Sequence, residues 1–179
     1  SGKTLQGFLE DNIFQPAEMI DTGFALKSDM KERFADCTIK ETENAAYHKY
    51  LTNADDYEQK NVNLLLGGSG LLSTISDYFK FTKIISDDGM YNDVKIISPH
   101  AVKKLTLNML PKDIASIGPN SFALMPTIGM GHSLGGSVII KPHENFSSSV
   151  GDYGWGGMAS TYFWIDKINK ITAIFFTQL

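Results

Sequence analysis

The last third of the chain carries the pattern that most restricts its fold. Residues 160–165 and 171–177 are rich in β-branched and aromatic side chains, and a short polar segment, residues 166–170, separates them. Two such runs joined by a short turn predict an antiparallel β-hairpin. A further run at residues 138–140 predicts another strand. An apolar sheet needs a second layer against its open face, so we expect helices from elsewhere in the protein to cover it.

The first part of the chain has the periodicity of helices. Apolar side chains recur on one helical face over residues 3–13, and Pro16 ends that segment. Residues 27–63 are rich in charge and weakly periodic, and we interpret them as a surface excursion with one short strand at residues 34–39. The glycines of residues 67–70 predict a tight turn that leads into the next helix.

Two further helices are marked by their capping residues. Thr74, with Asp77 three residues later, forms a predicted capping box. Behind it we expect a buried stripe made of Ile75, Tyr78, Phe79, Thr82 and Ile85. Ser98 followed by Pro99 predicts another helix start, and that helix should continue to about Leu110.

Composition divides the chain and excludes several classes of function. Most charged residues lie in residues 1–117, whereas both tryptophans and most glycines lie in residues 118–179. We therefore expect a mainly helical region followed by a glycine-rich β region, together forming one incomplete domain. The formal net charge is −4 and Arg33 is the only arginine, so no basic surface for nucleic acid is expected. No apolar run approaches the about 20 residues of a membrane span, and the first residues carry no signal-peptide pattern.

The residues that usually hold metals are scattered. The four histidines show no ligand spacing, and Cys37 is the only cysteine, so neither a metal site nor an internal disulfide is predicted. Ser1-Gly2-Lys3-Thr4 is similar to the end of a phosphate-binding loop, but no glycine or strand precedes it, and we interpret it as a helix start. No cofactor is expected.

Two serines stand in nucleophile-like motifs. Ser28 and Lys31 match S-x-x-K, but their neighbours are charged and the match is attributed to chance. Ser133 lies in a G-x-S-x-G sequence, residues 131–135. The residues after it are β-branched and then proline, so the helix of a nucleophile elbow does not fit, and no histidine follows Asp152 or Asp166 to complete a triad. A glycine-rich strand is the favoured interpretation, with a small lipase using Ser133 as the alternative.

The sequence Tyr153-Gly154-Trp155-Gly156-Gly157 is the strongest candidate for a binding site. Gly156 and Gly157 allow a ligand to approach the strand backbone closely, and Trp155 would form an apolar wall beside it. An edge strand with a packed tryptophan and a bulge is the alternative interpretation.

Several segments together resemble the later portion of serine β-lactamase-related hydrolases, the group of class C β-lactamases, family VIII esterases and penicillin-binding proteins. The resemblance is carried by residues 1–5, 13–16, 19–24, 67–74, 129–137 and 150–166. It implies an α+β fold of the β-lactamase/transpeptidase type. This chain would contain part of the helical region and the C-terminal antiparallel strands of the sheet.

The resemblance also assigns roles to the candidate site. Trp155-Gly156-Gly157 takes the place of the K-T-G triad of β-lactamases, in a form similar to that of esterase-like members. The resemblance implies that the backbone N–H of Met158 supplies half of an oxyanion hole, and that Tyr153, Trp155, Gly156 and Gly157 contact substrate. A tryptophan in place of the lysine favours a small ester or amide over a β-lactam.

The catalytic S-x-x-K and Y-x-N of this group lie upstream of the matching region. The S-x-x-K at Ser28 is in the wrong place, and no tyrosine here has asparagine two residues later. We therefore expect the C-terminal portion of a serine hydrolase, inactive on its own, whose open sheet is covered by a missing N-terminal half or by self-association. A non-catalytic ligand-binding module is the first alternative. The resemblance suggests a periplasmic or secreted parent protein.

Overall fold

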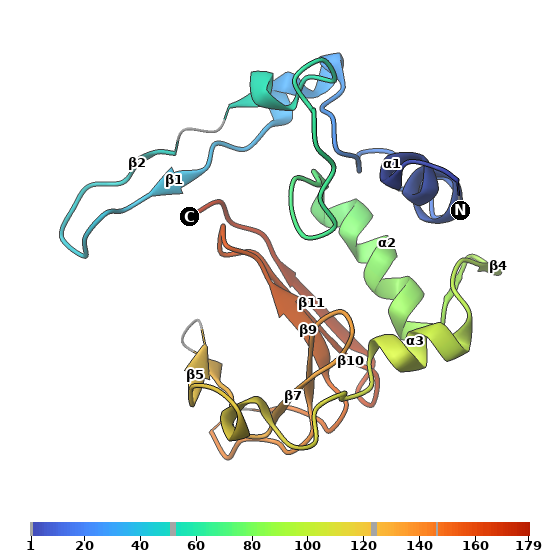
Figure 1. The fold of residues 1–179 in the computed structure, drawn as a ribbon, viewed down its shortest axis with the longest axis vertical. Coiled ribbons are helices and arrows are strands. Elements are labelled where there is room, and N and C mark those ends of the chain that lie inside the picture. Colours follow the sequence, from blue (N-terminus) through green and yellow to red (C-terminus); the bar gives the residue numbers. More distant parts are fainter. Residues whose placement is uncertain (1, 51–52, 123–124, 146) are drawn as a thin grey trace. The chain divides into compact units, whose positions relative to one another are not determined.

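A computed structural model describes residues 2–50, 53–122, 125–145 and 147–179 (Figure 1). The chain forms two compact units. Unit 1 comprises Ser1–Lys80, Met158–Thr161 and Phe176–Leu179, and unit 2 comprises Phe81–Gly157 and Tyr162–Phe175. Neither unit is one continuous stretch of sequence, because two short segments from the last quarter of the chain belong to unit 1.

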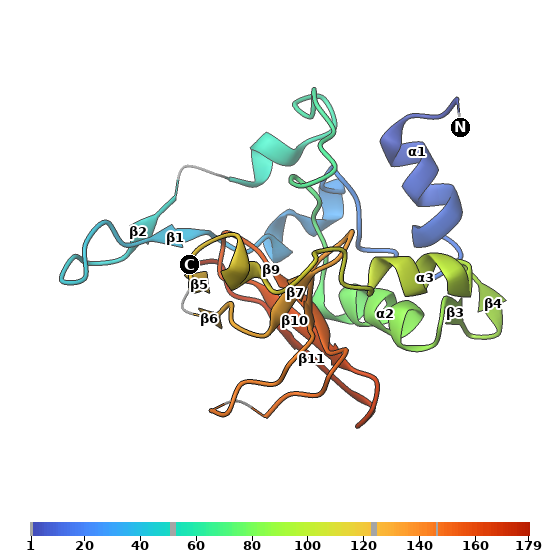
Figure 2. The ribbon, with the colours of Figure 1, turned by 60° about the horizontal axis from the view of Figure 1, so that its bottom comes forward.

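Unit 2 is built around a five-stranded antiparallel sheet with the strand order β11-β10-β9-β8-β7 (Figure 2). Its strands are β7 (Met130–His132), β8 (Ser137–Ile139), β9 (Tyr153–Gly156), β10 (Tyr162–Asp166) and β11 (Ile171–Phe175). The predicted hairpin is confirmed, with Tyr162 opposite Phe175 and Asp166 opposite Ile171. Alternating side chains of a strand face opposite sides of the sheet, so this register decides which residues enter the core.

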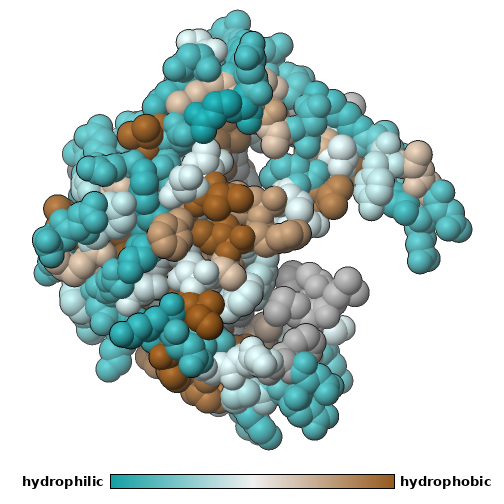
Figure 3. Space-filling view, turned by 180° about the vertical axis from the view of Figure 1, so that it is seen from behind, coloured by the Kyte–Doolittle hydropathy of each residue, from teal (hydrophilic) through white to brown (hydrophobic). Residues whose placement is uncertain are grey.

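One face of the sheet is buried and the other carries exposed apolar side chains. Phe163 and Ile165 are 6% and 1% exposed. The other buried apolar residues of unit 2 include Val138 and Tyr153 from the sheet, Ile84 and Ile85 from α2 (Ile75–Ser86), and Val102 from α3 (Pro99–Leu105). On the other face of β10 and β11, Trp164, Ile171 and Phe175 are 40%, 51% and 61% exposed. Apolar side chains are visible at the molecular surface in Figure 3.

Helix α3 begins as predicted and ends earlier than predicted. Ser98 caps it by accepting a hydrogen bond from the backbone N–H of Ala101 at 3.1 Å. The helix ends at Leu105 rather than near Leu110. The residues after it bind strand β7 instead, because Met109 donates its backbone N–H to the carbonyl of His132 at 2.8 Å.

Helix α2 also differs from the predicted pattern. Thr74 accepts the backbone N–H of Asp77 at 3.2 Å, as expected of a cap. The carboxylate of Asp77 does not complete a capping box within the helix; it accepts the backbone N–H of Asp21 at 2.7 Å. The predicted stripe is confirmed at Thr82 and Ile85, which are both 0% exposed. It is wrong at Ile75 and Phe79, which are 52% and 48% exposed, because the buried face also includes Asp77 and Ile84.

Unit 1 begins with α1 (Leu5–Leu9), which continues as a π-helical turn (Glu10–Phe14). Thr4 caps α1, in agreement with the predicted helix start, while Ser1 lies outside the described residues. A short hairpin of β1 (Thr38–Ile39) and β2 (His48–Lys49) occupies the charged segment, so the strand expected at residues 34–39 is only two residues long.

The remaining elements are short. They are two 3₁₀ helices in unit 1 (Ser28–Arg33 and Ala54–Tyr57), a third in unit 2 (Ile114–Ser116), and the strands β3 (Met90–Tyr91), β4 (Val94–Lys95), β5 (Ser121–Phe122) and β6 (Met125–Pro126). In the part of the chain that the structure describes, the α-helices precede residue 117 and the strands of the five-stranded sheet follow it. No helix within the described ranges is long and apolar enough to cross a membrane.

Candidate functional site

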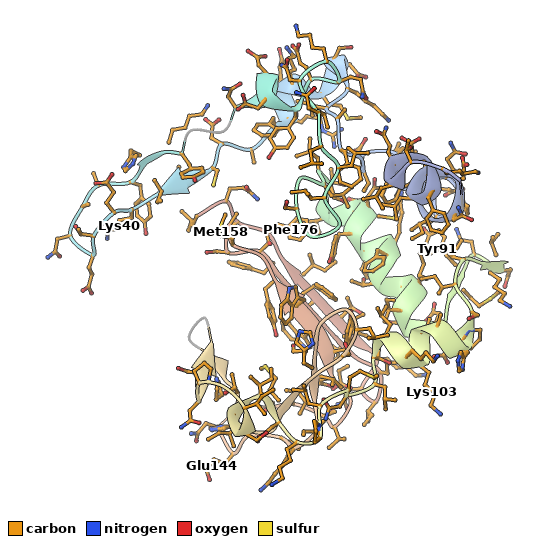
Figure 4. The ribbon with its side chains drawn as sticks, in the orientation of Figure 1. Lys40, Tyr91, Lys103, Glu144, Met158 and Phe176 are labelled. Atoms are coloured by element: carbon orange, nitrogen blue, oxygen red, sulfur yellow. The ribbon has the colours of Figure 1, made fainter. Side chains whose placement is uncertain are left out.

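The Trp155-Gly156-Gly157 sequence lies at the end of an internal strand. Strand β9 pairs with β10 on one side and with β8 on the other, so the edge-strand alternative is wrong for the strand as a whole. The pairing with β8 covers Tyr153 and Gly154, whereas Trp155 and Gly156 pair with β10 alone. The Trp155 side chain is 40% exposed, and Met158, the next residue after Gly157, is 97% exposed in the loop that follows (Figure 4). The end of β9 therefore presents an indole ring and a glycine backbone to solvent.

Gly154 explains how β9 fits between its neighbours. A Cβ atom at this position would lie 2.4 Å from the carbonyl oxygen of Phe163 on β10, so only glycine allows the strands to approach this closely. On the other side, the Ser137 hydroxyl donates to the Gly154 carbonyl at 2.9 Å. The backbone leading to Trp155 is thereby held by both neighbouring strands.

Tyr153 points into the core rather than toward solvent. It is 3% exposed, and its ring meets that of Phe163 with centres 5.9 Å apart. Burial raises the pKa of the Tyr153 hydroxyl to about 12, so this group stays protonated. Substrate contact by Tyr153 stays a prediction, and the contacts observed are those of a core residue that supports β9.

The loop that contains Met158 is fastened to the end of the chain within unit 1. The Thr177 hydroxyl donates to the Ser160 carbonyl at 2.8 Å, and the Ser160 hydroxyl donates to the Leu179 carbonyl at 3.1 Å. Ser160 itself adopts a left-handed backbone conformation, with φ +57°. A backbone N–H placed in such a fastened loop is a suitable oxyanion donor, because pre-oriented donors stabilise developing charge without reorganising. That role of Met158 stays a prediction.

Strand β1 joins the same network. The backbone N–H of Thr38 donates to the Gln178 carbonyl at 2.8 Å. The short hairpin of residues 38–49 is thereby attached to the segment that holds the Met158 loop.

His132 provides a contact that the sequence did not predict. Its ring lies edge to face with that of Trp155, with centres 5.2 Å apart and planes at 88°. The two residues belong to β7 and β9, which are separated by β8. No local pattern marks this pair, because their approach depends on the register of three strands.

This architecture is shared with known proteins. Among solved structures, Simvastatin Synthase (LovD) from Aspergillus terreus has a TM-score of 0.79 at 23% identity, covering 99% of this chain and 46% of that chain. EstCE1, a hydrolase with promiscuous acyltransferase activity, has a TM-score of 0.72 at 16% identity, covering 99% and 46%. Protein Rv1367c of Mycobacterium tuberculosis (strain ATCC 25618 / H37Rv) is 24% identical over 97% of this chain and 43% of its own length.

The Beta-lactamase family matches residues 1–179. The chain belongs to this family. The resemblance inferred from the motifs is thereby confirmed, as is the fold of the β-lactamase/transpeptidase type. The chain spans less than half the length of the relatives named above.

Within this β-lactamase family member, the G-x-S-x-G sequence forms a turn between β7 and β8. Ser133 is 3% exposed, and its hydroxyl donates to the Gly136 carbonyl at 2.9 Å and accepts the Gly136 N–H at 3.1 Å. Among the described residues no helix follows Ser133, so the nucleophile elbow is absent. The predicted glycine-rich strand is correct only for residues 131 and 132, because residues 133–136 form the turn. In the described ranges, the hydrogen bonds of the Ser133 hydroxyl are to the backbone of Gly135 and Gly136, and none is to a histidine or a carboxylate that would act as a base.

The S-x-x-K match at Ser28 lies in a 3₁₀ helix on the surface of unit 1. The Lys31 ammonium donates to Asp55 at 2.9 Å and also to Glu58. The bond to Glu58 and then that to Asp55 raise the pKa of Lys31. A lysine that activates a serine needs a lowered pKa, so this pairing opposes a catalytic role.

Two buried carboxylates lie at the opposite end of β9 from Trp155. Burial raises the pKa of Asp152, and the charge of Asp166 adds to the effect. Hydrogen bonds from Asn169 lower the pKa of Asp166. Within the described ranges, no three His, Cys, Asp or Glu side chains gather as metal ligands.

Proposed function

We propose that this chain forms the substrate-facing wall and the oxyanion side of an acyl-transfer site in a serine hydrolase of the β-lactamase family. The observation that carries the proposal is the Trp155-Gly156-Gly157 sequence at the end of an internal strand, followed by the fastened Met158 loop. Removing a single oxyanion-hole donor costs about 2.7–4 kcal/mol of transition-state stabilisation in another serine hydrolase. Met158 N–H is the donor that we assign here.

The nucleophile and its base are supplied, in this proposal, from outside these 179 residues. Lys31 is engaged by two carboxylates and Ser133 is engaged by its own turn, which argues against both serine motifs of the chain. The relatives are more than twice as long as the part that this chain matches, which leaves room in such proteins for a nucleophile and a base outside the matched part.

The substrate of the complete site would be a small ester or amide. Trp155 offers an apolar surface where a lysine would offer a cation, and the substitution removes the charge that would hold a β-lactam carboxylate. The hydrolase and acyltransferase activities named for the structural relative EstCE1 support this choice of substrate class.

A kinetic assay tests the proposal. The 179-residue chain is expected to hydrolyse neither p-nitrophenyl butyrate nor nitrocefin above the rate of a heat-denatured control. Turnover that disappears in Ser133→Ala would replace the proposal with a small lipase. Tight, saturable binding of ethyl butyrate without turnover, measured by calorimetry, would instead favour a ligand-binding module.

The open face of the β10–β11 hairpin is, in the same proposal, a contact surface for the rest of the protein or for a second copy. Trp164, Ile171 and Phe175 line it and are exposed. Large apolar patches on a soluble protein usually mark such surfaces.

A further inference from the structure

The G-x-S-x-G segment reaches the candidate site through His132. The edge-to-face geometry of His132 and Trp155, at 5.2 Å and 88°, is the arrangement that aromatic rings prefer. The indole is 40% exposed, so much of its surface is free of protein contacts. The imidazole therefore restrains a ring that is otherwise only partly enclosed.

His132 is itself held through its backbone. Its N–H donates to Asn108 Oδ1 at 3.0 Å, and its carbonyl accepts the N–H of Met109 at 2.8 Å. Asn108 also accepts the N–H of Leu110 at 3.2 Å, which fixes the amide in place. A Cβ atom at Gly131 would lie 2.4 Å from Asn108 Oδ1, so glycine is required for Asn108 to reach the strand.

The rest of the segment closes the turn behind His132. The N–H of Ser133 donates to the Gly136 carbonyl at 2.8 Å, and its hydroxyl makes the further bonds described above. A Cβ atom at Gly135 would lie 2.6 Å from Leu105 Cδ1 on α3. Gly131, Ser133 and Gly135, the defined positions of the motif, thus each help to place the turn through close packing or hydrogen bonds. None of these contacts requires a nucleophilic serine.

We propose that His132 is a positioning residue that orders the Trp155 indole, and that the G-x-S-x-G segment is the support that holds His132. The inference rests on the proposed function only in treating Trp155 as a wall of the substrate site. An ordered indole presents one fixed surface to the acyl or alcohol group of the substrate. Loss of His132 in the complete enzyme would therefore raise KM more than it lowers kcat.

The ordering is testable on the 179-residue chain without any turnover. The chain has two tryptophans, so Trp164→Phe leaves Trp155 as the single indole reporter. In that background, His132→Ala, His132→Phe and His132→Leu are compared by fluorescence anisotropy and acrylamide quenching. His100→Ala, an exposed histidine on α3, is the matched control. Far-UV circular dichroism establishes that each variant compared is folded.

The expected result is lower anisotropy and an acrylamide quenching constant about twofold higher in His132→Ala, because an unrestrained exposed side chain changes rotamer within nanoseconds. His132→Phe should restore both values, His132→Leu should not, and His100→Ala should match the parent. Unchanged fluorescence in folded His132→Ala and His132→Leu would overturn the inference, as would failure of His132→Phe to rescue. Labelling of a serine in this chain would refute the proposed function while leaving this result intact, so the two failures are distinguishable.

Discussion

Asp152 and Asp166 are joined through Ser149, whose backbone N–H donates to Asp152 Oδ2 at 2.9 Å while its hydroxyl donates to Asp166 Oδ2 at 2.9 Å. The two carboxylates are otherwise held differently. Asp166 also accepts two hydrogen bonds from Asn169, whereas Asp152 Oδ1 is buried with no hydrogen-bond partner among the described residues. Folding therefore favours the charged form of Asp166 and the neutral form of Asp152.

Asp152→Asn is expected to stabilise the protein at neutral pH. The raised pKa of Asp152 means that its contribution to stability is present at low pH and is lost as the pH rises through the folded-state value. Removing the buried charge should increase the free energy of unfolding at pH 7 by about 1 kcal/mol. The gain should shrink as the pH falls and the parent carboxyl becomes protonated, in urea denaturation followed at several pH values.

Asp166→Asn is the matched variant, and it is expected to change the stability at neutral pH in the opposite direction. The pKa of Asp166 is lowered, so its contribution is present at neutral pH and disappears as the pH falls through the folded-state value. We expect this variant to be less stable than the parent at pH 7, with a difference that narrows in acid. Equal effects of the two substitutions at pH 7 would contradict the asymmetry.

Asp77→Ala is expected to be strongly destabilising. Asp77 is 2% exposed, and its carboxylate accepts the N–H of Asp21 at 2.7 Å and the hydroxyl of Thr22 at 3.0 Å. The substitution leaves partly buried donors without an acceptor and empties a buried position, which costs about 2–4 kcal/mol. The measurement is thermal denaturation of both variants and the parent. Asp87→Ala, which breaks an exposed pair with Lys83, should cost no more than about 0.5 kcal/mol in it.

Much of the fold was predictable because its signals are local. The β10–β11 hairpin is encoded by alternation and by the turn at residues 166–170, and the α3 start by Ser98 and Pro99. The predictions of helix ends fail where a residue binds a partner that is distant in the sequence. Helix α3 ends early because residues 108 and 109 bind His132, which lies more than twenty residues further along the chain.

The candidate site shows the same division. The glycines and Trp155 were recognised from the sequence, since glycine next to an aromatic residue in a strand is unusual. The restraint of Trp155 by His132 could not be recognised, because it requires the pairing of β7, β8 and β9. The hydrogen bond from the Ser133 hydroxyl to the Gly136 carbonyl, which closes the turn, also depends on the pairing of β7 with β8.

Gly154→Ala tests the close approach of β9 and β10. The added methyl group would lie 2.4 Å from the Phe163 carbonyl oxygen and 3.0 Å from Trp164 Cβ, so the strands must move apart. A loss of about 2–3 kcal/mol in the free energy of unfolding is expected. Gly67→Ala, where the new Cβ meets no atom within 4 Å, should change stability by less than about 0.5 kcal/mol. Similar losses in both variants would refute the argument.

Phe175→Lys tests the open sheet face. Phe175 is 61% exposed on the same face as Trp164 and Ile171. Sedimentation velocity at increasing concentration should show self-association of the chain and a shift toward monomer in the variant, because a charge in the patch opposes apolar contact. Leu64→Lys, at an exposed leucine of unit 1, should leave the association unchanged. A parent chain that stays monomeric at every concentration would remove self-association as the cover for this face.

Reaction with a fluorophosphonate tests the central claim most directly, because this reagent forms a covalent adduct with an activated serine. The 179-residue chain is incubated with the probe and its intact mass is measured beside that of Ser133→Ala. We expect no adduct on either protein, since the proposed function gives this chain the Trp155 wall and the Met158 donor and places the nucleophile and its base outside it. An adduct on any serine of the folded chain, located by fragment mass spectrometry and absent after denaturation, would contradict this account.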